Sequence, residues 1–136
     1  MNFIKYKKNT GQIVSLCCGP EGVMKLNESD IIGTLRGECD SCSTHRVDLK
    51  TKRIVKRSKN KIAWNKLLIK ADEIDLATAT GIPKGADVLV IGAGTHTSIT
   101  INDGTLEVTA NAPGEYIVQI QCFPFLDHEV IINGEN

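Results

Sequence analysis

Apolar and polar residues alternate over short segments throughout the second half of the chain. Residues 116–123, for example, place an apolar side chain at every second position, which is the period of a strand with one buried face. Glycine or proline separates most of these segments, and both residues favour turns. The pattern predicts seven short strands, at residues 67–69, 74–80, 88–91, 96–101, 106–109, 116–123 and 129–132. Such a series is typical of a β-sandwich, so we expect an immunoglobulin-like sandwich over residues 62–136.

One nine-residue phrase occurs twice in the first half of the chain. YKKNTGQIV spans Tyr6–Val14, and VDLKTKRIV spans Val47–Val55. Both copies begin with a strand-forming residue, have threonine in fifth place and end in Ile-Val. Because Asn9 and Gly11 tolerate positive φ, the phrase predicts a β-hairpin. The second copy has Lys52 at the place of Gly11, so we expect its turn to depend less on positive φ. With only three identities, chance resemblance between two hairpins is the alternative.

Between the two phrases the pattern is weaker. Apolar residues at 13–16 and 31–35 predict two further strands, and residues 21–26 predict a short helix or a loop. Few apolar residues remain to build a core, so we expect this half to depend on a partner chain, a metal or disulfides. The fold class that follows is all-β, with an N-terminal hairpin module before the sandwich.

Charge divides the chain into two parts. Residues 1–66 hold 14 Lys and Arg against 6 Asp and Glu, whereas residues 67–136 hold 2 against 10. The segment KRSKNK, at residues 56–61, is strongly charged and lacks periodicity, which is typical of a linker. We therefore predict a basic domain over residues 1–61 and an acidic domain over residues 62–136.

Composition indicates the class of protein. The chain is 41% hydrophobic and 24% charged, as soluble globular proteins are. The opening MNFIKYKKNTG has no apolar signal core, and no apolar run approaches the ~18 residues of a membrane helix. We expect synthesis in a cytosol and no contact with a membrane.

Four of the five cysteines lie in the first half, where they are candidates for metal binding. A C-x-x-C pair supplies half of a zinc site, and a nearby histidine with one further cysteine can complete it. The candidate zinc ligands or disulfide partners are Cys17, Cys18, Cys39, Cys42 and His45. Adjacent side chains on a strand point to opposite faces, which argues against a second knuckle. Reduced, packed cysteines are the interpretation that we favour, so we assign no metal; Cys122 is expected to be a small buried hydrophobe.

The segment VLVIGAGTHT, which begins at Val88, resembles the strand and glycine-rich turn of a dinucleotide-binding fold. Gly92 and Gly94 fit that motif, but Thr97 stands at the third glycine position and a β-branched run follows. Such a run disfavours the helix that the motif needs. We interpret the segment as a strand connection and expect no cofactor. The three histidines are scattered and no catalytic motif is present, so no catalytic residue is assigned and no enzyme is predicted.

The basic stretch Arg46–Lys61 raises the question of nucleic acid. It holds eight Lys and Arg and one acidic residue, enough to contact phosphates. It contains no aromatic residue on which a base could stack. A charged hairpin edge, or a patch that docks on an acidic partner, would have the same composition. Nucleic-acid binding is therefore the less favoured interpretation.

The segment Tyr6–Arg57 is similar to small structural proteins of tailed bacteriophages. These proteins tend to open with Y-x-x-x-T-G-x-I and to continue with G-x-x-D-x-x-T-H-x-V-D-x-x-T-x-x-I-V. The residues that match the second pattern are Gly37, Asp40, Thr44, His45, Val47, Asp48, Thr51, Ile54 and Val55, with one residue more between Asp40 and Thr44 than the pattern has. The chain departs from it at Lys52, where glycine is usual, and at Cys39 and Cys42. Residues 67–136 resemble the immunoglobulin-like modules of phage particles, in D-x-A-T-x-T-G-I-P-x-G-A and P-G-E-Y-x-V-x-I.

The resemblance implies a non-enzymatic structural component of a bacteriophage virion that is made in the host cytoplasm. The first half would attach to other virion structural proteins, and the second half would project outward. The expected partner-binding residues are Tyr6, Ile13, Val14, Val47, Ile54 and Val55. Phage tails and fibres follow rotational symmetry, so a homo-oligomer is expected. The four first-half cysteines are the candidates for disulfides in it, and Cys122 is expected to stay reduced. The alternatives are a tail-fibre assembly chaperone and a regulator that binds zinc or nucleic acid.

Overall fold

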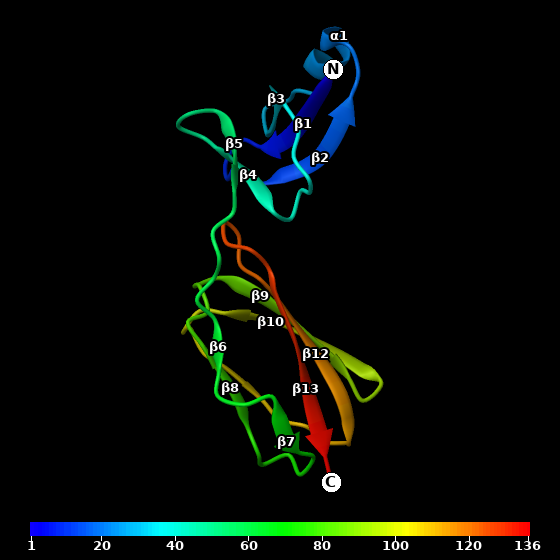
Figure 1. Cartoon of the computed structure of the whole chain (residues 1–136), viewed down its shortest axis with the longest axis vertical. Helices are drawn as coiled ribbons and strands as arrows, with labels where there is room; N and C mark the ends of the chain where they lie inside the picture. Colours follow the sequence, from blue (N-terminus) through cyan, green and yellow to red (C-terminus); the bar gives the residue numbers. More distant parts are fainter. The chain divides into compact units, whose positions relative to one another are not determined.

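The computed structural model describes all 136 residues, which form two compact units, Met1–Ser58 and Lys59–Asn136 (Figure 1). Strands account for 51% of the residues, and there is one short helix. The division between the units lies inside the charged segment 56–61. No helix is long and apolar enough to cross a membrane.

The first unit consists of two small sheets and a helix. Strands β1 (Asn2–Lys7), β2 (Ile13–Cys18) and β3 (Ile32–Arg36) form an antiparallel sheet in the order β2-β1-β3. Helix α1 (Glu21–Leu26) joins β2 to β3. Strands β4 (His45–Asp48) and β5 (Arg53–Lys56) form a separate hairpin. The two predicted hairpins are confirmed, and residues 21–26, predicted as a short helix or a loop, form a helix.

The core of the first unit is small. Four buried residues from the three strands β1, β2 and β4 form it: Ile4, Tyr6, Ile13 and Val47. The ring of Tyr6 covers Gly33 on the neighbouring strand, where a Cβ atom would lie 2.6 Å from the Tyr6 Cζ atom. A glycine opposite an aromatic residue lets the ring lie flat on the sheet and fill the missing side-chain space. Partly buried side chains, among them Leu35 and Ile54, complete the cluster.

The repeated phrase corresponds to a repeated structure. Tyr6 pairs with Ile13 in the first hairpin, and the aligned residues Val47 and Ile54 pair in the second. The Gly11 N–H donates to the Lys7 carbonyl at 2.8 Å, and the N–H of Lys52 donates to the Asp48 carbonyl at the same distance. Because the aligned positions make the same bonds, the two phrases encode the same turn.

The expectation for the second turn was wrong. Lys52 has a φ of 55°, in the same left-handed region as Gly11 with a φ of 84°. The turn therefore requires positive φ in both copies. The Asp48 side chain supports the second turn by accepting the N–H of Lys50 at 2.9 Å, and this backbone donor lowers the pKa of the Asp48 carboxyl.

The two hairpins of the first unit contact each other reciprocally. The N–H of Val47 donates to the Gly11 carbonyl at 2.8 Å. The ammonium of Lys52, which aligns with Gly11, lies 5.8 Å from the ring of Tyr6, which aligns with Val47. Each turn thus lies against the first residue of the other phrase. This pairing gives the unit a core that neither hairpin could enclose alone.

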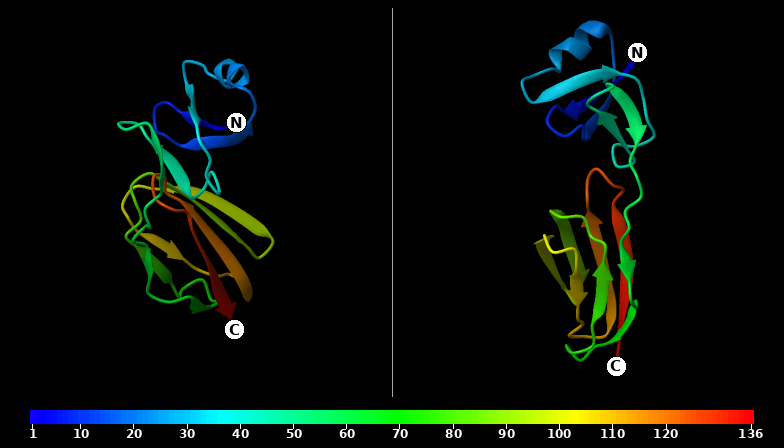
Figure 2. Two further views of the ribbon diagram at one scale, coloured as in Figure 1. Left: turned by 45° about the horizontal axis from the view of Figure 1, so that its top comes forward. Right: turned by 90° about the vertical axis from the view of Figure 1, so that its left-hand side faces the viewer.

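The second unit has two sheets that enclose one core (Figures 1 and 2). The larger sheet has the order β10-β9-β12-β13-β7, and the smaller has the order β11-β8-β6. All neighbours are antiparallel except β13 and β7, which run parallel. The strands are β6 (Ala63–Trp64), β7 (Leu68–Lys70), β8 (Ala77–Thr80), β9 (Ala86–Gly92), β10 (Thr95–Ile101), β11 (Leu106–Val108), β12 (Gly114–Gln121) and β13 (His128–Glu135).

Alternation in the sequence matches burial in this unit. Tyr116, Val118 and Ile120 on β12 are buried, and the residues between them are partly exposed. Ala77 and Ala79 on β8 are fully buried, and their small side chains let the facing sheet approach closely. All seven predicted strands are present; β6 was not predicted. The Gly92–Gly94 segment connects two strands, as predicted, because β9 and β10 form a hairpin.

Candidate functional site

Three of the predicted cysteine ligands line one pocket of the first unit. The pocket has a volume of about 280 Å³, and its walls come from β1, β2 and the segment after β3. It is lined by Asn2, Phe3, Ile4, Leu16, Cys17, Cys18, Gly37, Glu38 and Cys39. Cys42 and His45 lie outside this lining. Cys17, Cys18, Cys39 and Cys42 form no disulfide.

The pocket does not bring the cysteines into a metal-binding arrangement. No group of three or more His, Cys, Asp or Glu side chains in the chain is placed to hold a metal ion. Cys17 pairs with Phe3 and Cys18 with Asn2 across β1 and β2, so the two adjacent thiols take opposite faces of the sheet. Burial raises the pKa of the Cys39 thiol, which disfavours the thiolate that metal binding and nucleophilic attack require.

The loop between β3 and β4 is held by a buried arginine. The Arg57 side chain is 7% exposed and donates to the carbonyl of Cys42 at 2.9 Å and to that of His45 at 3.3 Å. The His45 ring contacts the Thr44 hydroxyl at 2.8 Å. Arg57, one of the eight basic residues of the stretch 46–61, therefore supports this loop.

The predicted partner-binding residues differ in how exposed they are. Tyr6, Ile13 and Val47 are 5% exposed or less, so they cannot contact another chain unless the core opens. Ile54 and Val55 are partly buried on β5. Val14 on β2 is 42% exposed. Sequence reasoning identified the apolar positions but could not distinguish those that this unit covers itself.

The exposed face of β2 includes a residue that sequence reasoning missed. Leu16 is 45% exposed and lies two positions beyond Val14 on the same strand. β2 is an outer strand of its sheet, and Cys18 at its end is exposed. We name the exposed face formed by Val14, Leu16 and Cys18 the β2 surface.

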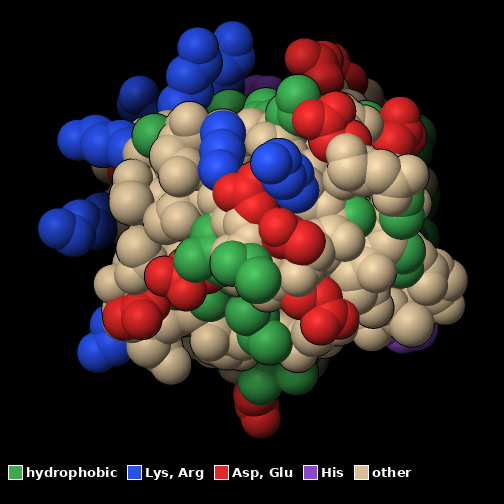
Figure 3. Space-filling view, turned by 90° about the horizontal axis from the view of Figure 1, so that it is seen from below, with side chains coloured by type: hydrophobic (Ala, Val, Ile, Leu, Met, Phe, Trp, Pro, Cys, Tyr) green, Lys and Arg blue, Asp and Glu red, His purple; other side chains and the backbone are tan.

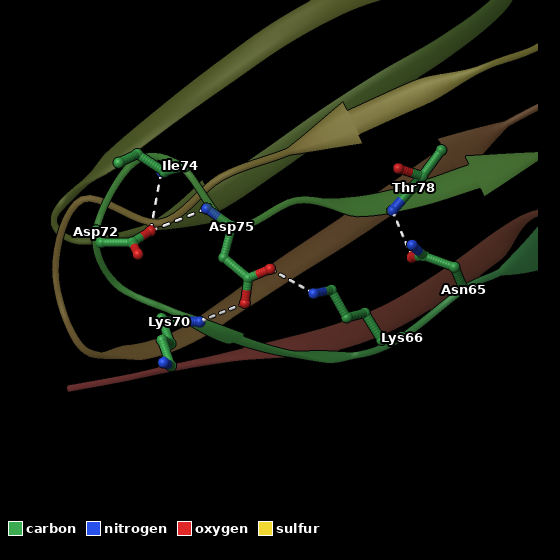
Figure 4. Close-up of polar contacts among 7 residues, drawn as sticks. All are labelled: Asn65, Lys66, Lys70, Asp72, Ile74, Asp75 and Thr78. Atoms are coloured by element: carbon green, nitrogen blue, oxygen red, sulfur yellow. Dashed lines mark hydrogen bonds and ion pairs between the residues drawn. The ribbon is translucent and has the colours of Figure 1, made fainter.

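A polar network organises one end of the second unit (Figure 4). The Asp75 carboxylate forms an ion pair with Lys66 and accepts the N–H of Lys70 at 3.0 Å. Asp72 accepts the N–H groups of Ile74 and Asp75, both at 2.9 Å. The hydrogen bond from Lys66 lowers the pKa of Asp75, and the N–H groups of Asp75 and Ile74 lower that of Asp72. The network thus fixes the turn between β7 and β8.

This fixed turn and the strand before it present apolar side chains to solvent. Ile74 in the turn is 80% exposed, and Leu68 on β7 is 54% exposed. The space-filling view of this end shows hydrophobic side chains in a band that acidic side chains border (Figure 3). Asp72 and Asp75 are occupied by backbone donors and by Lys66, so their role here is structural.

Two hydrogen bonds join the start of the second unit to the first residue of β13 and to the segment before it. The Trp64 indole N–H donates to His128 Nε2 at 3.1 Å, and the Asn60 amide donates to the Leu126 carbonyl at 2.9 Å. Trp64 is on β6 and His128 is on β13, so the first bond connects the two sheets. Burial lowers the pKa of His128, consistent with a neutral ring whose Nε2 accepts.

The outermost strand of the larger sheet has the most exposed side chains. Six of the seven residues of β10 are exposed; the exception is Ile101. A polar groove of about 400 Å³ opens beside it, lined in part by Thr95, Thr97 and Tyr116. The alternation of residues 96–101 predicted a strand here, but it gave no sign that the strand forms an edge.

Comparison with known proteins identifies no relative of this chain, since no family model, no curated protein and no solved structure matches it.

Proposed function

We propose that the chain is a non-enzymatic structural component of a bacteriophage particle. In this proposal the first unit attaches to neighbouring virion proteins, and the second unit is an immunoglobulin-like module. The sequence resemblance described above suggests the virion, and the arrangement of the second unit supports the module.

The strand order supports an immunoglobulin-like topology. Such folds place strands B and E in one sheet and strands C, F and G in the other. In this chain β8 and β11 pair in the smaller sheet, and β9, β12 and β13 are neighbours in the larger one. β8 and β11 take the places of B and E, and β9, β12 and β13 those of C, F and G. β10 follows as an additional edge strand.

The Tyr116 side chain gives the main support for an immunoglobulin-like module. Immunoglobulin-like domains have a tyrosine near the start of strand F whose hydroxyl bonds to the backbone a few residues upstream. Tyr116 lies near the start of β12, and its hydroxyl donates to the Ala112 carbonyl at 2.7 Å and accepts the Ala112 N–H at 3.2 Å. The second unit lacks the disulfide of antibody domains, because Cys122 is its single cysteine.

The β2 surface supports attachment through the first unit. An outer strand can add a strand from another protein, and exposed apolar side chains on it supply contact area. Val14 and Leu16 meet both conditions, whereas the lysines and arginines on β5 protect that strand from pairing. The β2 surface therefore replaces the buried core residues as the proposed contact.

Mass spectrometry of purified particles tests the proposal. A structural component is expected in mature particles at a fixed ratio to other virion proteins, whereas an assembly chaperone is expected only in the lysate. Leu16→Asp should reduce incorporation, and Leu26→Asp is the matched control, because Leu26 is 85% exposed on α1 of the same unit. Absence of the wild-type chain from particles would overturn the proposal.

A further inference from the structure

Strand β10 has a free edge along its whole length. It lies at the end of the larger sheet, and only β9 pairs with it. The register with β9 is continuous from Thr95–Gly92 to Ile101–Ala86, without a bulge. A two-residue turn with positive φ at Ala93 and Gly94 connects the strands, as in the hairpin turns that match the twist of the strands. The free edge is therefore regular, and another strand can pair with it.

Natural edge strands usually carry features that prevent pairing, such as charges, prolines, bulges or short length. β10 has none of these, because its sequence is THTSITI and it has seven residues. The other outer strands of this unit are protected. β7 has three residues and ends in Lys70, β6 has two residues, and β11 has three with Glu107 in the middle.

We propose that the free edge of β10 pairs antiparallel with β10 of a second copy of this chain. A two-fold axis at Ser98 closes such a pair, because each copy offers the same edge to the other. The two larger sheets then become one continuous sheet. This inference is independent of the proposed function, since it rests only on the second unit.

The register about Ser98 matches side chains of compatible type. Thr97 lies opposite Ile99 of the second copy, and Thr95 lies opposite its Ile101. Pairs of β-branched residues stabilise antiparallel strands, and like charges placed opposite each other destabilise them. On the other face, His96 lies opposite Thr100. No like charges meet, since the strand has no acidic or basic residue other than His96.

The pairing also covers apolar surface that the unit leaves open. Ile99 pairs with Val88, so it lies on the inner face of the sheet. Val88 is 1% exposed, whereas Ile99 is 41% exposed, because the three-stranded sheet opposite leaves β10 largely uncovered. In the paired arrangement, Ile99 of each copy gains a neighbour on that inner face.

A second copy fits this edge better than a strand of another chemical type. A charged partner strand would find no complementary charge on β10 and would lose hydration on pairing. A second β10 supplies equal length, the same alternation and hydroxyl or β-branched side chains at each position. The seven-residue contact is small for a protein interface, so we expect a micromolar dimer rather than a permanent one.

Sedimentation of the full chain tests the proposal with charges on the two-fold axis. Ser98 is exposed, so Ser98→Lys and Ser98→Glu each place like charges opposite each other only in the dimer. We expect each variant to weaken the dimer about fivefold. An equimolar mixture of the two should restore association, because opposite charges then meet. Unfolded variants could not produce that rescue.

Ile131→Lys is the matched control. Ile131 is 45% exposed on β13, an internal strand of the same sheet, so this lysine should leave the dimer unchanged. A wild-type chain that stays monomeric up to about 1 mM, the range of even weak association, would overturn the proposal. So would dimers of equal strength in wild type and both Ser98 variants, or no rescue in the mixture.

Discussion

The indole N–H of Trp64 donates to Nε2 of His128 at 3.1 Å, and this bond joins the two sheets of the second unit. It requires a neutral histidine, since a protonated ring has no free acceptor. Burial lowers the pKa of His128 in the folded chain. As the pH falls, His128 therefore binds a proton in the unfolded chain before it does so in the folded chain. Acid shifts the equilibrium towards the unfolded chain in this range.

We predict that the second unit loses stability as the pH falls through the unfolded His128 pKa of 6.5. Above pH 6.5 the contribution of neutral His128 to stability is fully present. This contribution declines as the pH falls towards the lower pKa of His128 in the folded state. Denaturant unfolding followed by the fluorescence of Trp64, the single tryptophan, measures this from about pH 7.5 to about pH 5.5. His128→Gln should flatten the pH dependence, and His96→Gln should retain it. A dependence that survives in His128→Gln would contradict the assignment.

Gly11→Ala should destabilise the first unit by about 2 kcal/mol or more, because it combines positive φ with a clash. A Cβ atom at Gly11 would lie 2.1 Å from the Val47 carbonyl oxygen. Hydrogen exchange at the Ile4 amide, in the core of this unit, measures the effect. Gly85→Ala in the second unit is the control for positive φ alone, since Gly85 has a φ of 85° and a Cβ atom there would meet open space. Its effect is measured by hydrogen exchange at the Val118 amide, in the core of that unit. Equal losses in the two variants would show that the contact with Val47 contributes nothing.

Lys52→Gly should stabilise the first unit by about 1 kcal/mol, because glycine adopts positive φ without the penalty of a side chain. Lys52→Ala retains that penalty and removes the cation that lies 5.8 Å from the Tyr6 ring, so it should be neutral or slightly destabilising. The same exchange measurement compares the two. The strain assignment fails if glycine and alanine have the same effect.

Tyr116→Phe should cost the second unit about 1–2 kcal/mol, because the backbone N–H and carbonyl of Ala112 lose their partner. Tyr6→Phe is the corresponding control in the first unit, where the ring packs on Gly33. Thermal unfolding of each variant, followed by circular dichroism, provides the comparison. An unchanged second unit in Tyr116→Phe would remove the main support for the immunoglobulin-like assignment.

Local sequence determined the strands and turns of this protein. Alternation along residues 114–121 is enough to specify β12, because every second side chain must face the core. The repeated phrase specified two hairpins for the same reason. The conformation at Lys52 was not apparent from the sequence, because the partners that hold its turn include Asp48 and the ring of Tyr6, a residue far away along the chain.

Tertiary structure decided which apolar residues are free to bind. Tyr6, Ile13 and Val47 have the same chemical character as Val14 and Leu16, but the packing of the two hairpins buries the first three. Tertiary structure likewise decided the surroundings of the candidate zinc ligands, because it places Cys39 beside Cys17 and Cys18 in one pocket and leaves Cys42 and His45 outside its lining.

Local sequence patterns likewise did not predict the order of the strands in the sheets. The sequence of residues 95–101 specifies a strand, but its place at the edge follows from the pairing of β9 with β12, whose residues are distant in the chain. The two-residue strand β6 is too short to show a period, and it exists because β8 pairs with it. Sequence by itself determined which segments are extended and which turn, because those preferences are local. Tertiary structure decided which faces and edges remain exposed, because burial depends on neighbours that the chain brings together only when it folds.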